Sequence, residues 1–325
     1  MLKRNRQSGV TLIELMIAMT IGLVMMAGAI SLFIQGKRSY LENERITRMQ
    51  DDSRFALGEL TRDLANAGFW GELPAAESIT PDASLTLAVD CGPPGVPWVY
   101  DFSNALTAVD NATGANAAAQ FGCIDAAVVQ PGADVIGVKR TTGNFFVPPL
   151  DNGAVYVKSN GVVGLLFKQP ADTPPAVNVP APSSDWLYSP SVWYVRNHAS
   201  DADRADGIPT LCRKMLDTTG VPSMVEECIA RGVEDLQIEF GIDTNGDAAA
   251  DQYLADPTAV ELGRVVAIRV FLLARSVEPQ VGYHNSKSYQ LGNRPVITPD
   301  DNFYRRVYTA TITTRNLRNQ ARFGL

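Results

Sequence analysis

The sequence predicts an α+β protein, with one long amino-terminal helix packed on a globular body built mainly of antiparallel β-sheet. Three observations predict this class. The segment from Lys37 to Ala67 contains no proline and carries apolar residues at helical spacing. From about residue 69 onward, short apolar runs alternate with glycine, proline, asparagine and aspartate, as strands alternate with turns. No regular helical pattern is interleaved with these runs, which argues against a doubly wound parallel sheet.

The composition argues against several classes of protein. The chain has 325 residues, 19% of them charged, and a formal net charge of −7. So low a charged fraction excludes a disordered polyelectrolyte, and the negative balance gives no reason to expect a nucleic-acid partner. The only histidines are His198 and His284, and the common nucleophile, phosphate-loop and zinc-protease motifs are absent from the sequence. The chain is therefore not expected to be an enzyme.

The amino terminus predicts a single membrane anchor. Three basic residues precede the apolar run, namely Lys3, Arg4 and Arg6. In the run Val10–Ile34, Glu14 is the only ionisable residue, and about 20 apolar residues suffice to cross a bilayer as a helix. The run is longer than the apolar region of a signal peptide and lacks its cleavage site. The leading charges favour a cytoplasmic amino terminus, although Lys37 and Arg38 flank the other end.

Four cysteines lie beyond this anchor, namely Cys91, Cys123, Cys212 and Cys228. Their even number, without any C-x-x-C spacing, is typical of disulfides in an oxidising compartment and not of a zinc site. Pairing in sequence order closes the shortest loops, and each bridge would then contribute about 3–4 kcal/mol. The cysteines thus favour a periplasmic or extracellular body.

The helix is expected to continue past the membrane to Ala67, since Gly68, Gly71 and Pro74 mark its end. A stripe of mostly apolar residues recurs at steps of three and four, namely Ile46, Met49, Ser53, Leu57, Leu60, Leu64 and Ala67. The remaining face is charged, with six basic and six acidic residues that include Asp63. The stripe predicts packing against the chain's own sheet, with a coiled-coil partner as the alternative.

Eight strands are predicted in the body, and several of them alternate apolar and polar residues. They are Leu85–Val89, Asp134–Arg140, Ala154–Lys158, Val162–Phe167, Val192–Val195, Glu234–Phe240, Val265–Leu273 and Tyr304–Thr314. The proline-rich segment Gln169–Ser184 predicts an extended loop, and Ala105–Ala119 predicts a loop or a weak helix.

A cluster of oxygen ligands suggests a calcium loop. It places side-chain oxygens at relative positions 1, 3, 5 and 9, in Asp243, Asn245, Asp247 and Asp251. The match to an EF-hand fails, because position 6 is Ala248 and position 12 is Leu254. The alternative is an Asn-Gly turn between two strands, and the two interpretations are compatible.

The residues Ser8-Gly9-Val10-Thr11-Leu12-Ile13-Glu14-Leu15, after a short basic leader, resemble the processing site of type IV pilins and type II secretion pseudopilins. The resemblance implies that a prepilin peptidase cuts after Gly9 and methylates the new amino terminus at Val10. It also implies that Glu14 pairs with the terminal amine of a neighbouring subunit during assembly. The family usually has phenylalanine where this chain has Val10.

Later segments resemble the PilW-type minor pilins of type IV pilus assembly. They are Asp134–Arg140, Val233–Gly246, Val265–Arg275 and Thr313–Leu317. The resemblance implies a pilin-like fold and a structural role in pilus assembly and initiation. Two alternatives are a minor pseudopilin of a type II secretion system and a membrane-anchored periplasmic enzyme or binding module.

The resemblance also implies domains, partners and a location. The domains would be a leader of residues 1–9, a helix of residues 10–68 that spans the membrane over 10–34, and a periplasmic body of residues 69–325. The partners would be other minor pilins, the major pilin, the prepilin peptidase, the inner-membrane assembly platform and a tip adhesin. The protein would lie in the bacterial inner membrane and then in the pilus at the cell surface. No cofactor is required, with Ca²⁺ as the one candidate.

Overall fold

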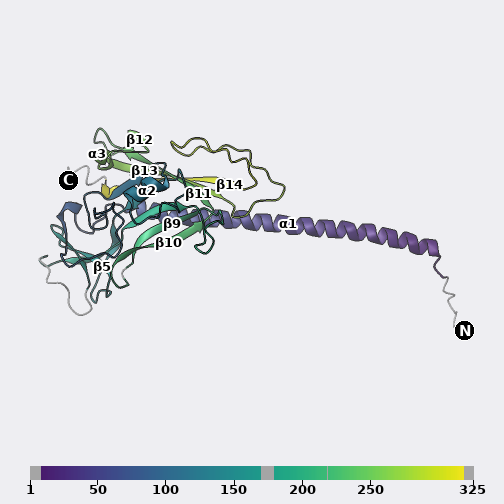
Figure 1. The fold of residues 1–325 in the computed structure, drawn as a ribbon, viewed down its shortest axis with the longest axis horizontal. Coiled ribbons are helices and arrows are strands. Elements are labelled where there is room, and N and C mark those ends of the chain that lie inside the picture. The colour runs from purple at the N-terminus through teal and green to yellow at the C-terminus, as the bar shows by residue number, and fades with distance from the viewer. Residues whose placement is uncertain (1–8, 170–178, 218, 318–325) are drawn as a thin grey trace. The chain divides into compact units, whose positions relative to one another are not determined.

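The computed structural model describes residues 9–169, 179–217 and 219–317. Contacts divide the chain into two units, residues 1–48 and 49–325. Helix α1 (Leu12–Ala65) begins in the first unit and ends in the second (Figure 1). The leader charges Lys3, Arg4 and Arg6 lie outside the described residues.

The second unit begins with the last turns of α1. Six side chains of the helix are buried, namely Met49, Ser53, Ala56, Leu60, Asp63 and Leu64. Met49, Ser53, Leu60 and Leu64 belong to the expected stripe, whereas Leu57 of that stripe is only partly buried. Asp63, which sequence reasoning assigned to the charged face, is buried instead. The helix ends at Ala65, and Gly68 then takes a φ of +71°, a left-handed conformation that glycine adopts without strain.

Three sheets form the body, and every ladder between their strands is antiparallel except that of β1 with β6. The first sheet has the order β1 (Ile79–Pro81), β6 (Gly164–Lys168), β5 (Val155–Ser159), β7 (Ser184–Tyr188) and β4 (Thr141–Phe146). The second has the order β10 (Ser223–Arg231), β9 (Thr210–Asp217), β8 (Ser191–Arg196), β3 (Val135–Val138) and β2 (Leu106–Val109). The third has the order β12 (Gln252–Leu254), β11 (Val233–Ile242), β13 (Val265–Arg275) and β14 (Arg305–Thr313). The short helices are η1 (Ala76–Ser78), α2 (Gly114–Gln120) and α3 (Ala259–Leu262). The predicted α+β class is confirmed.

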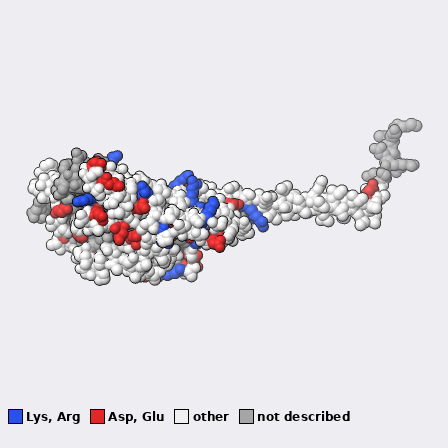
Figure 2. All heavy atoms as spheres, turned by 90° about the horizontal axis from the view of Figure 1, so that it is seen from above, with Lys and Arg blue, Asp and Glu red and all other residues white. Residues whose placement is uncertain are grey.

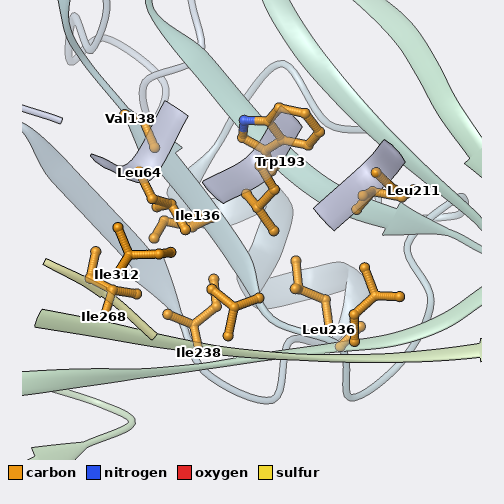
Figure 3. Packing of buried hydrophobic residues seen from close by; sticks show 14 of the residues in the cluster. Leu64, Ile136, Val138, Trp193, Leu211, Leu236, Ile238, Ile268 and Ile312 are labelled. Carbon is orange, nitrogen blue, oxygen red and sulfur yellow. The ribbon is translucent and has the colours of Figure 1, made fainter. Parts of the chain in front are cut away.

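The main core lies where α1 meets the second and third sheets. Figure 3 shows Leu64 of α1 near Ile136 and Val138 of β3, with the third sheet on the far side of the cluster. The labelled residues of the third sheet are Leu236, Ile238, Ile268 and Ile312, all buried. Burial of this apolar surface is the main force holding the helix to both sheets.

A buried aspartate joins the second sheet to the third. The N–H of Asp134 donates to the carbonyl oxygen of Leu236 at 2.8 Å, and its Oδ2 accepts from the N–H of Ile238 at 2.7 Å. Its Oδ1 accepts from the N–H of Asn111 at 2.8 Å. Burial raises the pKa of Asp134 to about 8, and the two backbone hydrogen bonds only partly offset this effect.

Some predicted elements were wrong. Leu85–Val89 forms no strand: Val89 makes one isolated bridge to Ser223, at the point where β10 begins. Leu85 and Leu87 are partly buried against a second group of core residues that includes Trp98, Phe121 and Val192, so packing and not a ladder explains the alternation. Ala105–Ala119 contains β2 as well as most of α2. Most of Gln169–Ser184 lies outside the described residues.

Seven strands were not anticipated, namely β1, β2, β4, β7, β9, β10 and β12. Three of them have only three or four residues, which gives periodicity too little length to act on. Strands β9 and β10 are longer, but each carries three charged residues, and most positions along both strands are half-buried or exposed.

Candidate functional site

The apolar part of α1 is uncovered in this chain. Of the described residues, every one from 9 to 41 is exposed, and Leu12 and Phe33 keep 79% and 73% of their surface. The most apolar window of the helix has a mean hydropathy of 2.3, so α1 is long and apolar enough to cross a membrane. Figure 2 shows this stretch almost entirely without charged side chains, whereas red and blue side chains are interspersed on the body. Such a surface needs a lipid or protein environment to cover it.

Glu14 closes the amino-terminal end of this helix. Its Oε2 accepts hydrogen bonds from the N–H of Thr11 at 2.9 Å and from the Thr11 hydroxyl at 2.8 Å. The N–H of Glu14 in turn lies 3.4 Å from the hydroxyl oxygen of Thr11. This reciprocal pair is a capping box, in which Thr11 precedes the first helical residue. The pattern Thr-x-x-Glu was readable in the sequence as a helix start, but sequence reasoning did not use it.

The capping box fixes where the carboxylate lies relative to the predicted cleavage position. The bond between Gly9 and Val10 lies one residue before Thr11. An amine released at Val10 would therefore form next to the backbone N–H of Thr11, which already donates a hydrogen bond to Glu14. The structure leaves Gly9 and Val10 exposed, so the bond between them is accessible in the isolated chain.

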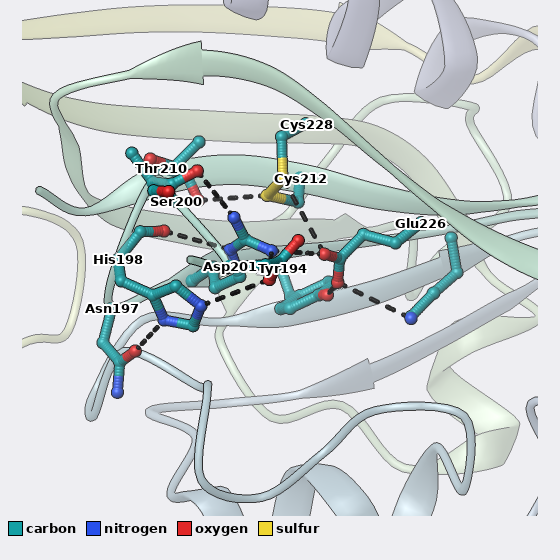
Figure 4. Close-up of a disulfide and its surroundings, with 12 residues drawn as sticks. Tyr194, Asn197, His198, Ser200, Asp201, Thr210, Cys212, Glu226 and Cys228 are labelled. Atoms are coloured by element: carbon teal, nitrogen blue, oxygen red, sulfur yellow. Dashed lines mark hydrogen bonds and ion pairs between the residues drawn. A yellow bond between two sulfur atoms is a disulfide. The ribbon is translucent and has the colours of Figure 1, made fainter. Parts of the chain in front are cut away.

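The cysteines form two disulfides, Cys91 with Cys123 and Cys212 with Cys228. This is the pairing in sequence order. Figure 4 shows the second bridge between β9 and β10, beside Glu226. Among the described residues, the group of side chains close enough to hold a metal consists of these two cysteines and Glu226. Because both sulfur atoms are in the disulfide, they offer no thiolate to a metal.

The two histidines do not meet. His198 is buried, with its Nδ1 2.7 Å from the side-chain oxygen of Asn197. The Nε2 of His198 lies 3.6 Å from an oxygen of Asp201. His284 is exposed and contacts Asp300 at 2.9 Å. Each histidine contacts one aspartate, but in the described residues no serine or cysteine side chain is hydrogen-bonded to either imidazole ring. Neither histidine therefore belongs to a catalytic triad within the described residues.

The Asp243–Asp251 loop joins β11 to β12, as expected of a turn between two strands. Both oxygens of Asp243 accept backbone N–H groups within the loop, from Asn245, Gly246 and Ala248. Asp251 accepts from both the hydroxyl and the N–H of Thr244, and these bonds lower its pKa. The loop is thus closed by its own hydrogen bonds, and nothing in the described structure supports Ca²⁺ there. Its ligand set of Asp243, Asn245, Asp247 and Asp251 remains a prediction.

Two family models match the chain. Residues 4–30 match the prokaryotic N-terminal methylation motif, and residues 192–316 match the type IV pilus-assembly protein W. The second match extends from β8 past the end of β14, and so includes the whole third sheet. The likeness to PilW-type pilins is confirmed.

No curated protein and no solved structure matches the chain significantly. The PilW likeness is that of a structural class of protein, not of an enzyme class. In the methylation motif and the apolar amino-terminal helix, the chain is similar to membrane-anchored pilins of the type IV pilus. The family of the second match is named for type IV pilus assembly.

Proposed function

We propose that this PilW-like chain is a structural minor pilin that takes part in the assembly and initiation of a type IV pilus. A prepilin peptidase removes the leader, residues 1–9, and Val10 becomes the N-methylated amino terminus. Glu14 then pairs with the terminal amine of a neighbouring subunit as the helix of residues 10–34 passes from the inner membrane into the filament. The observation that carries the proposal is this lone carboxylate on an exposed apolar helix that starts beside the cleavage position.

The proposal explains why a carboxylate is kept in an apolar helix. An acidic side chain at the centre of a membrane helix costs about 2.5–3.5 kcal/mol on insertion scales. A cationic amine in the same apolar surroundings offsets that cost, because charges attract far more strongly at low dielectric constant than in water. Removing one partner then leaves the other charge uncompensated.

The location and the partners follow from the same role. The body, residues 69–325, lies in the periplasm, in agreement with its two disulfides. Other minor pilins, the major pilin, the inner-membrane assembly platform and a tip adhesin are the proteins that it contacts. The match of residues 192–316 to the pilus-assembly protein W supports a pilus rather than a secretion system as the machine.

Glu14→Gln tests the pairing role. A glutamine at this position still accepts the N–H of Thr11, so the capping box survives and only the charge is lost. The variant should reach the inner membrane in normal amount and be cut after Gly9, while its incorporation into pili should fall sharply. The matched control is Thr11→Ala, which costs the helix cap about 1 kcal/mol but keeps the carboxylate.

Gly9→Val separates processing from docking. Within the described residues, a side chain added at Gly9 meets no atom within 4 Å, so a loss of cleavage reflects the peptidase and not this chain's fold. Incorporation of Glu14→Gln at the wild-type level would overturn the pairing role. Deleting the whole protein should remove surface pili and leave type II secretion intact; the reverse result would identify a pseudopilin.

A further inference from the structure

Strand β14 is the outermost strand of the third sheet, and one of its sides pairs with no other strand among the described residues (yellow in Figure 1). At one end of its ladder with β13, the N–H of Thr314 donates to the carbonyl oxygen of Val266. At the other end, the N–H of Ser276 donates to the carbonyl oxygen of Tyr304. Hydrogen-bonded pairs recur at every second residue of an antiparallel ladder. The backbone N–H and C=O groups of the even-numbered residues of β14 therefore point towards β13.

The odd-numbered residues of β14 direct their N–H and C=O groups away from the sheet. These residues are Arg305, Val307, Thr309, Thr311 and Thr313. Within the described residues, no backbone hydrogen bond outside the β13 ladder reaches them. The three threonines are exposed, and the run Val307–Thr314 contains no charge, proline or glycine. A long uncharged edge of this kind is a template for another strand.

The other edges in the described body are blocked. The outer side of β11 is occupied by β12 at one end and by the backbone and side chain of Asp134 at the other. Strand β10 carries Glu226, Glu227 and Arg231, and its first residue is bridged to Val89. Strands β1 and β2 have only three and four residues, and β4 has an irregular register. Proteins usually protect the edge strands of their sheets in these ways, and among the described strands β14 is the long edge strand without such protection.

We propose that the free edge of β14 binds an extended strand of another pilus subunit by backbone pairing, and that this strand carries acidic residues at its ends. Alternate backbone groups over Val307–Thr313 supply the hydrogen bonds, which is the mode called β-strand addition. The exposed Arg306 and Arg315 bracket this run and supply charge selection. The proposal rests on the proposed function only for the source of the strand.

A second copy of this chain is a poor occupant of the same edge. Antiparallel pairing of two copies centred on Ala310 would bring Arg315, which begins a short helical segment after β14, towards the exposed Arg306 of the other copy, whereas Arg305 is already paired with Glu234 and Asp301. Parallel pairing in register would put each arginine beside itself. Like charges directly opposite one another destabilise a sheet, so the flanking cations select a partner with carboxylates in those places.

The test measures amide hydrogen exchange of the full-length chain in detergent micelles, residue by residue, with a synthetic peptide as the probe. The peptide has alternating threonine and valine residues flanked by glutamates. Binding should slow exchange at Val307, Thr309, Thr311 and Thr313 by at least about tenfold, whereas even-numbered amides are protected already. A peptide with lysine flanks should protect the same amides much less.

Thr311→Pro removes an outward donor and leaves the ladder with β13 intact, because the N–H of Thr311 faces away from β13. It should abolish peptide protection while the even-numbered amides stay protected, which shows in the same measurement that the strand is folded. Thr311→Val keeps the donor and is the matched control. In cells, Thr311→Pro should be cut after Gly9 normally yet enter pili poorly.

Three results would overturn the proposal. Absence of protection by the glutamate peptide would exclude strand addition at β14. Equal protection by both peptides would exclude selection by Arg306 and Arg315. Protection of the outward amides that increases with protein concentration alone would assign the edge to a second copy. A failure of the Glu14 test would leave these peptide results unchanged, so the two proposals fail separately.

Discussion

The buried carboxylate of Asp63 should be the most sensitive single position in the attachment of α1 to the body. One oxygen accepts from Arg140, with Nε at 3.0 Å and Nη2 at 2.5 Å. The other accepts from the hydroxyl of Ser191 at 2.8 Å and from Nε1 of Trp193 at 2.9 Å. The side chains of Asp63 and Arg140 keep only 5% and 16% of their surface exposed, so water cannot replace a lost partner well.

The magnitude follows from this burial. Removing one member of a buried ion pair costs about 3–5 kcal/mol, because the other charge stays buried without compensation. Asp63→Asn should therefore lower the free energy of unfolding by that amount, since the amide also points an N–H₂ group at existing donors. Ser191→Ala removes one hydrogen bond to a charged group and should cost about 1.5–3 kcal/mol. Asp51→Asn, at an exposed helix position, is the matched control and should stay within about 0.5 kcal/mol.

The assay is urea unfolding of the full-length chain in detergent micelles under non-reducing conditions, followed by tryptophan fluorescence. A double-mutant cycle with Arg140→Met should recover part of the loss, because it removes the stranded charge. If Asp63→Asn unfolds like Asp51→Asn, or if the cycle shows no coupling, then Asp63 does not carry the attachment that its contacts indicate.

Two further predictions concern pH and calcium. The pKa of Asp134 rises from 3.8 to about 8 on folding, so the folded chain keeps a proton that the unfolded chain has released. Stability should therefore fall as pH rises from about 4 to about 8, by up to about 1.4 kcal/mol per pH unit from this group. Asp134→Asn should flatten that slope, and parallel curves would contradict the argument. At the β11–β12 loop, Asp243 and Asp251 already accept backbone hydrogen bonds, so Ca²⁺ should bind only weakly, with a Kd of about 10⁻⁴–10⁻³ M. Millimolar Ca²⁺ should raise the melting midpoint above the midpoint measured in chelator. Equal midpoints would contradict a calcium site and support only the interpretation as a turn.

The long helix and its apolar half were predictable because they depend on local properties. Residue spacing, the absence of proline and a run of apolar side chains act within a few turns of the chain. The same holds for strand β11, in which Leu236, Ile238 and Phe240 alternate with polar residues and are buried as expected. Even the helix start at Thr11 carried a local signal, although it went unused.

The burial of Asp63 and the closure of β11 by Asp134 could not be predicted from the sequence. Asp63 stands on a helix among other charged residues, and only Arg140, 77 positions later, makes its burial tolerable. Asp134 meets Ile238 across 104 positions of sequence. Periodicity carries no information about such distant partners. It therefore assigned Asp63 to solvent, the usual place of an isolated carboxylate.

Partner choice needs more than the apolar helix can supply. Burial of apolar surface is not directional, so the helix of residues 10–34 can pack against any similar helix. In the proposed pairing, Glu14 adds one charge, which would set the axial position of a subunit but would not distinguish neighbours that present the same terminal amine. A backbone edge bracketed by Arg306 and Arg315 has direction and charge pattern, and complementary charge is what suppresses wrong partners.

The two sites should therefore respond differently to substitution. Glu14→Gln should lower incorporation into pili beside every neighbour alike. Charge reversal at Arg306 and Arg315 should instead change which subunit cross-links to the body while leaving the helix able to enter the filament. Glu14 lies in the first unit and both arginines lie in the second. The loss of incorporation into pili in the combined variant should therefore equal the sum of the losses in the two separate variants. A combined loss far from the sum would mean that the two sites act as one, and that the edge of β14 does not choose the partner independently of Glu14.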